Sequence, residues 1–215
     1  MIETLAHSTT LLAFLAASFV LAATPGPGVM FIVTRTISQG RGAGLASVGG
    51  VALGNFGNAV GASIGLAAIF AISSTAFLLV KMAGACYLIY LGLSALRNKP
   101  AGCTPKDVPK TQIVKIFKEG FWVALLNPKT AIFFAAFLPQ FIETSASTMS
   151  QSVGLGAAFV VIAMCTDTAY VLAAATVAPA LARIARGATL GRYITGSVFI
   201  GLGLLTAFSG NRATK

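Results

Sequence analysis

The polar residues most able to bind a charged group lie inside apolar sequence. Asn127, Pro128 and Lys129 interrupt an apolar run that continues on both sides. A lysine near the centre of a bilayer costs roughly 2.5–3.5 kcal/mol on insertion scales, so its side chain has to face the interior of a helix bundle. Proline lacks a backbone N–H group, whereas asparagine is a good N-cap and proline a good first helical residue. The stretch therefore predicts two half-helices that meet within the membrane.

A second interruption lies at Pro25-Gly26-Pro27-Gly28. It divides the apolar stretch 9–38, which is too long for one straight span, and Thr24 is expected to cap the second half-helix. The amino ends of half-helices carry partial positive charge and unpaired N–H groups, which suit a carboxylate, and Lys129 would add a full charge. The predicted binding residues at the two interruptions and on the helix between them are Thr24, Pro25, Gly26, Pro27, Gly28, Asn55, Asn127, Pro128, Lys129 and Thr130.

Asp167 is the carboxylate at the centre of a later apolar segment, residues 152–178. It is predicted either to bind an ammonium group or to carry an exchanged proton. The alternative is a purely structural pair with Lys129, because buried charges usually find a partner. Neutral side chains at the same depth are Asn58, Thr166 and Tyr170, for which solute contacts and interhelical contacts are equally good interpretations.

The composition excludes most other classes of protein. Of 215 residues, 56% are hydrophobic and only 9% are charged, and the mean hydropathy is +0.86. The net charge of +10 does not indicate a nucleic-acid partner, because most basic residues lie between apolar segments, as in membrane loops. The three cysteines form no CxxC pair, and a single histidine and a single central carboxylate are too few for a membrane enzyme or a metal site. We expect no enzyme activity and no cofactor.

The segments predict an all-α integral membrane protein with six transmembrane helices. Residues 1–96 and 113–215 each run as a broken helix, a helix rich in small residues with a polar centre, and a plainer helix, with a basic connector at 97–112. The breaks near 24–28 and 127–129 correspond, as do Asn55 and Asp167. Because each half has three spans, the second is inverted relative to the first. Inverted repeats with paired broken helices are typical of secondary transporters, whose substrate sites lie at the breaks.

The distribution of basic residues predicts the orientation. One side receives eleven arginines and lysines from the loops, and the other receives at most Lys81, Arg212 and Lys215. The excess marks the cytoplasmic side, which places both termini outside. The first apolar stretch lacks a positively charged leading region, so we expect a retained helix and not a cleaved signal peptide.

Several motifs resemble the LysE/RhtB family of amino-acid exporters. They are Thr24-Pro25-Gly26-Pro27-Gly28, the turn from Gln39 to Leu45, the block from Leu126 to Phe134, and Leu138-Pro139-Gln140-Phe141. The resemblance covers nearly the whole chain. It implies efflux of amino acids or their derivatives across a bacterial inner membrane, driven by exchange for protons. Gly28 and Asn55 depart from the polar residue and the aspartate that many relatives carry there.

A passive channel or facilitator for small polar metabolites is the alternative to an antiporter. Its flux would ignore the proton gradient. The sequence does not name the solute, although the single Asp167 favours a neutral amino acid or a small derivative over a basic one. It also leaves the oligomeric state open, including a homo-oligomer in the lipid bilayer.

Overall fold

The computed structural model describes residues 2–64, 74–97, 110–142, 148–184 and 188–208, which form helices and short connections. None of these residues lies in a strand. The helices are α1 (Ile2–Ala23), α2 (Pro27–Gln39), α3 (Arg41–Ser63), α5 (Ser74–Arg97), α6 (Lys110–Leu125), α7 (Pro128–Ile132), α8 (Thr148–Ile184) and α9 (Ala188–Phe208). A π-helical turn η1 (Phe133–Phe137) and a 3-10 turn η2 (Leu138–Phe141) follow α7 directly.

Both predicted helix interruptions are present. The axis bends by 48° between α1 and α2, and two residues separate the end of α6 at Leu125 from the start of α7 at Pro128. Asn127 is the N-cap of α7 and Pro128 its first residue, as the sequence predicts. The prediction that Thr24 caps α2 is wrong. Its hydroxyl instead donates a 2.6 Å hydrogen bond to the carbonyl of Val20, one turn back in α1, and Gly26 takes the N-cap position.

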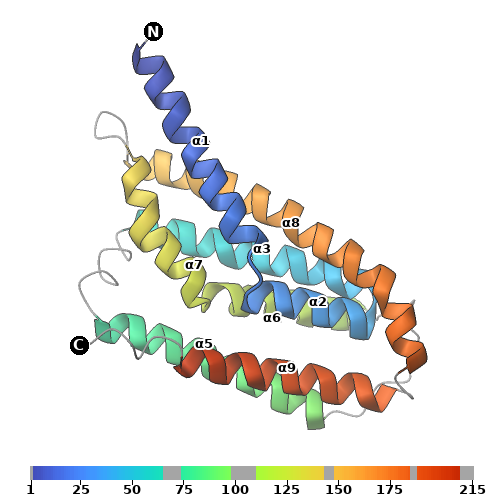
Figure 1. The fold of residues 1–215 in the computed structure, drawn as a ribbon. Helices are drawn as coiled ribbons and strands as arrows, with labels where there is room; N and C mark the ends of the chain where they lie inside the picture. Colours follow the sequence, from blue (N-terminus) through green and yellow to red (C-terminus); the bar gives the residue numbers. More distant parts are fainter. Residues whose placement is uncertain (1, 65–73, 98–109, 143–147, 185–187, 209–215) are drawn as a thin grey trace.

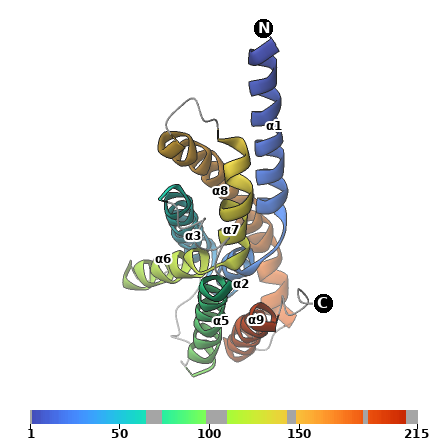
Figure 2. The ribbon, with the colours of Figure 1, turned by 90° about the vertical axis from the view of Figure 1, so that its left-hand side faces the viewer.

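The helices pack in two groups, which Figures 1 and 2 show from perpendicular directions. In the larger group, α3 lies against α6 and α8, and α8 also contacts α1 and α2. Helices α5 and α9 lie side by side along one edge of this group. Helix α8 continues without a break through Thr166, Asp167 and Thr168, so this polar triplet interrupts only the apolar character of the segment.

Two glycines allow the backbones of α3 and α6 to touch. A Cβ atom on Gly50 would overlap the carbonyl of Phe117, and one on Gly54 would overlap the carbonyl of Phe121. The four-residue spacing of these glycines predicts such a packing face, and close approach of this kind is typical of helix pairs in membranes. It fixes α3 against α6 immediately beside the second helix break.

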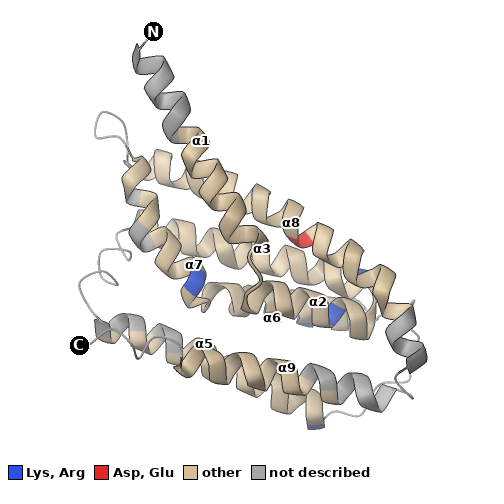
Figure 3. Cartoon of the chain, viewed as in Figure 1, with Lys and Arg blue, Asp and Glu red and all other residues tan. Residues whose placement is uncertain are grey.

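The outer surface of the bundle is largely apolar. Leu12, Val20, Leu79, Val161 and Leu205 are each at least 60% exposed, and they lie on four different helices, α1, α5, α8 and α9. Charged side chains are sparse along the described helices (Figure 3). By length and apolarity, one described helix, Met149–Pro179, is long enough to span a membrane, or two if the bent pair α1–α2 counts as one span.

Two further described helices, Met82–Arg97 and Gly196–Phe208, are apolar but shorter than a full span. Six spans in two inverted repeats therefore remain a prediction, as do the boundaries 1–96, 97–112 and 113–215. Most of the basic connector, residues 98–109, lies outside the described residues.

The close glycine contact between α3 and α6 leads to a prediction about the melting temperature. Gly54→Ala places a methyl group against the Phe121 carbonyl, 2.8 Å from the Ala124 Cβ, and forces the two backbones apart. Overpacking of this kind costs about 1–3 kcal/mol, so the melting temperature of the detergent-purified protein is expected to fall. The matched control is Gly154→Ala in α8, where a Cβ atom meets nothing within 4 Å. Equal melting temperatures for the two variants would contradict the close packing.

Candidate functional site

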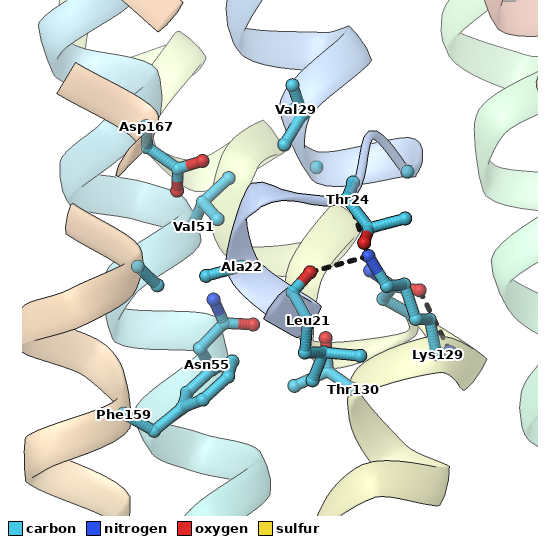
Figure 4. Close-up of a pocket in the computed structure, with 14 residues that line it drawn as sticks. Leu21, Ala22, Thr24, Val29, Val51, Asn55, Lys129, Thr130, Phe159 and Asp167 are labelled. Carbon is cyan, nitrogen blue, oxygen red and sulfur yellow. Dashed lines mark hydrogen bonds between the residues drawn. The ribbon is translucent and has the colours of Figure 1, made fainter. Parts of the chain in front are cut away.

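A small cavity lies where the two helix breaks meet (Figure 4). Its volume is about 40 Å³, which is room for about three water molecules and not for an amino acid. The helices must therefore separate before a larger solute can enter. The cavity is lined by Leu21, Ala22, Thr24, Gly26, Gly28, Val29, Val51, Asn55, Asn127, Lys129, Thr130, Phe159, Ala163 and Asp167.

Eight of the residues singled out from the sequence line this cavity, from both halves of the chain. They are Thr24, Gly26, Gly28, Asn55, Asn127, Lys129, Thr130 and Asp167. Pro25, Pro27 and Pro128 shape the breaks without lining the cavity, and Thr166 donates a hydrogen bond to Ala163 within α8. The contacts of Asn58 and Tyr170 are with helix ends, as described below.

The sequence reasoning missed the apolar part of the wall. Val51 lies one turn before Asn55, and Ala163 and Phe159 lie one and two turns before Asp167. Residues separated by one helical turn share a face, so the spacing from Asn55 and Asp167 could have predicted these wall residues. The wall thus combines a few polar groups with apolar surface, which is typical of small-molecule sites.

Lys129 holds the carboxyl end of α1. Its ammonium group donates hydrogen bonds of 2.8 Å to the carbonyl of Leu21 and 2.6 Å to the carbonyl of Thr24. The Tyr170 hydroxyl donates a 2.7 Å bond to the carbonyl of Ala23 beside them. Carbonyls at the end of a helix have no partner within that helix and carry partial negative charge. A lysine of the second break therefore stabilises the first break.

The helix ends at the second break are also satisfied. The Asn58 side-chain amide, on α3, donates a 2.9 Å hydrogen bond to the carbonyl of Ala124 in the last turn of α6. At the start of α7, the Asn127 side chain accepts a 3.1 Å bond from the backbone N–H of Lys129. Both amides thus supply partners that water would supply in a soluble protein.

The amino end of α2 differs from the other three ends. Its N-cap, Gly26, has no side chain to accept a hydrogen bond, and Pro27 has no N–H to donate. Within the described residues, the first backbone bond of this end runs from the N–H of Met30 to the carbonyl of Gly26. The N–H groups of Gly28 and Val29 are therefore left for another acceptor, and both residues line the cavity.

Asp167 faces the same cavity from α8. The residue is only 5% exposed, and among the described residues its carboxylate takes part in no hydrogen bond or ion pair that the structure records. Figure 4 shows the carboxylate directed toward Val51 and Val29, whereas the Lys129 ammonium is directed at Leu21 and Thr24. The two charges therefore do not form a direct pair. Asn55, 6% exposed, lines the same cavity from α3 and lies beside Phe159 in Figure 4.

A buried ion pair away from the cavity corrects the sequence analysis. Glu119 on α6 lies 2.5 Å from a guanidinium nitrogen of Arg35 on α2. The two side chains are 11% and 13% exposed and join α2 to α6. The guanidinium also lies 5.4 Å from the centre of the Phe31 ring. Arg35 is one of the eleven basic residues that the sequence assigns to the loops of one side, and it instead belongs to the packed interior.

The chain belongs to the LysE type translocator family, whose model matches residues 19–210. A family of translocators and an outer surface rich in exposed apolar side chains together define a multi-pass membrane protein.

Named relatives cover almost the whole chain. It is 32% identical to a homoserine/homoserine lactone efflux protein of Salmonella typhimurium, over 91% of this chain and 94% of the relative. It is 27% identical to a leucine efflux protein of Salmonella choleraesuis, over 87% and 90%. An uncharacterized membrane protein of Vibrio cholerae is 30% identical, over 91% and 95%. No solved structure matches the chain.

The Arg35–Glu119 pair makes a prediction about folding. Glu119→Ala leaves the Arg35 charge buried without its partner, and breaking a buried pair in this way costs about 3–5 kcal/mol. The free energy of unfolding in detergent is expected to fall by that order. The double variant Arg35→Met with Glu119→Leu removes both charges and is expected to recover most of the loss. A double variant less stable than Glu119→Ala would show that the pair is not the cause.

Proposed function

We propose that this protein is a secondary active exporter of amino acids or small amino-acid derivatives. The observation that carries the proposal is the cavity at the two helix breaks, which combines an open helix amino end with an unpaired buried carboxylate. Irregular backbone and an unpaired charge at such depth are costly, and in membrane proteins they mark solute pathways. The relatives are named for efflux of homoserine, its lactone and leucine, which supports the same class of solute.

The lining favours a small neutral amino acid. Asn55 and Thr130 offer neutral polar groups, and Val51, Phe159 and Ala163 offer apolar surface. A short aliphatic or hydroxylated side chain matches this combination. A basic side chain would need a second carboxylate, which the described cavity wall does not contain.

Export is proposed to be coupled to proton entry through Asp167. A buried carboxylate with no direct hydrogen-bond or ion-pair partner is strongly destabilised, so it is expected to hold either a proton or a cationic substrate. Exchange of the proton for the substrate at Asp167 would give antiport. The proposed setting is a bacterial inner membrane, with six spans, two inverted repeats and both termini periplasmic.

The function is tested with cells that lack their own exporters. Cells expressing the protein are preloaded with labelled homoserine, homoserine lactone or leucine, and the rate of efflux is measured with and without a protonophore. We expect faster efflux of at least one of these compounds than in cells with an empty vector, and loss of the increase when the proton gradient collapses.

Two results would contradict this proposal in different ways. Efflux of all three compounds at the rate of the empty-vector cells would exclude an amino-acid exporter of this specificity. Faster efflux that the protonophore leaves unchanged would exclude proton antiport and identify a passive facilitator.

A further inference from the structure

The four helix ends at the two breaks are not equivalent. Side chains of the protein make hydrogen bonds to three of them: Lys129 and Tyr170 bind the end of α1, Asn58 binds the end of α6, and Asn127 caps α7. In the described part of the chain, the amino end of α2 alone among them has no cap. An open helix amino end with partial positive charge is suited to an anionic or carbonyl oxygen.

A second observation points to a ligand at the same place. Asp167 is only 5% exposed and lines the same cavity, and its carboxylate makes no recorded hydrogen bond to a described residue. Figure 4 shows it directed toward Val29, in the first turn of α2. A negative side chain therefore lies opposite a positive helix end. This is the charge pattern that a zwitterion complements.

We infer that the exported amino acid binds in one orientation, with its ammonium group on Asp167 and its carboxylate or ester carbonyl on the N–H groups of Gly28 and Val29. This inference rests on the proposed exporter function and makes it more specific. Lys129 is then a positioning residue and not a ligand of the substrate carboxylate. Both strong hydrogen bonds of its ammonium already go to carbonyls of the α1 end.

Gly26 supports this role for Lys129. A Cβ atom at Gly26 would lie 3.3 Å from Cδ and 3.7 Å from Nζ of the lysine, so the glycine leaves just enough room for the side chain to reach α1. Gly28 differs, because a Cβ atom there would make only an ordinary 3.5 Å contact with Val51. The fold therefore tolerates a methyl group at Gly28, whereas a substrate approaching the α2 end would meet it.

The first test varies the substrate and leaves the protein unchanged. Labelled leucine or homoserine, whichever the cells export, is transported into inside-out vesicles containing the wild-type protein. The competitors are the same amino acid unlabelled, its methyl ester and its N-acetyl derivative. The ester keeps the ammonium and a carbonyl, whereas acetylation removes the positive charge. We expect the ester to compete and the N-acetyl derivative to be weaker by roughly 10- to 100-fold, the loss of one charged hydrogen bond.

The second test varies Asp167 and measures binding of the labelled amino acid to the purified protein, because loss of the proton exchange proposed at this residue would also stop transport. Asp167→Asn is expected to weaken competition by the free amino acid by a similar factor and to reduce its advantage over the N-acetyl derivative to about twofold or less. Asp167→Glu keeps the carboxylate and is expected to retain the preference for a free amine. Equal competition by both compounds in the wild-type protein, or an undiminished preference in Asp167→Asn, would overturn the inference. The wild-type series decides the matter even if the variant does not fold.

The third test separates Lys129 from the α2 end. Lys129→Met is expected to lower the melting temperature and the transport rate, to leave the ratio of free acid to methyl ester unchanged, and to be rescued by Lys129→Arg. Gly28→Ala is expected to keep the melting temperature and weaken binding of both compounds, with Gly154→Ala as the control. A Lys129→Met protein of normal stability in which the ratio of free acid to methyl ester differs from that of the wild-type protein would overturn the positioning role. Failure of the wild-type protein to transport any of the probes would instead refute the exporter function itself.

Discussion

Every part of this molecule depends on satisfying backbone groups that two helix breaks release inside an apolar bundle. No water is present in a hydrocarbon core to hydrogen-bond such groups, so the protein has to supply the partners. Lys129 is central because it reaches from the second break to the carbonyls that end α1 at the first. Its positive charge is stabilised by the negative end of a helix, without a carboxylate partner.

The asymmetry between the two breaks gives the cavity its polarity. Nearly the same interruption occurs in both halves, yet one break carries its own caps and the other has glycines where side-chain acceptors would be. Some of the polar side chains that line the cavity thus stabilise helix ends, whereas others remain able to contact a solute. Asp167 belongs to the second group, because it faces the open end of α2 and does not pair with Lys129.

The sequence predicts the breaks well because proline, glycine and asparagine impose local geometry. Asn127 and Pro128 determine their own positions at a helix start, and the glycines of α3 predict close packing. The partners of long polar side chains are not predictable in the same way. Lys129 bonds to carbonyls over a hundred residues away, and Glu119 binds Arg35 at a separation of 84 residues, because tertiary packing and not spacing decides these contacts. The π-helical turn after α7 has no local sequence signal that we recognise.

The contact between α3 and α6 also has a mechanical meaning. Where backbones touch at Gly50 and Gly54, no flexible side chain lies between the helices to absorb a displacement. Two helices in direct backbone contact, with no flexible side chains between them, are expected to move together as one rigid unit. Because α3 carries Asn55 and α6 leads into Asn127, we expect these two walls of the cavity to keep a fixed separation. Widening of the cavity is therefore expected to displace α1, α2 and α8, the helices that carry Asp167 and the open amino end of α2.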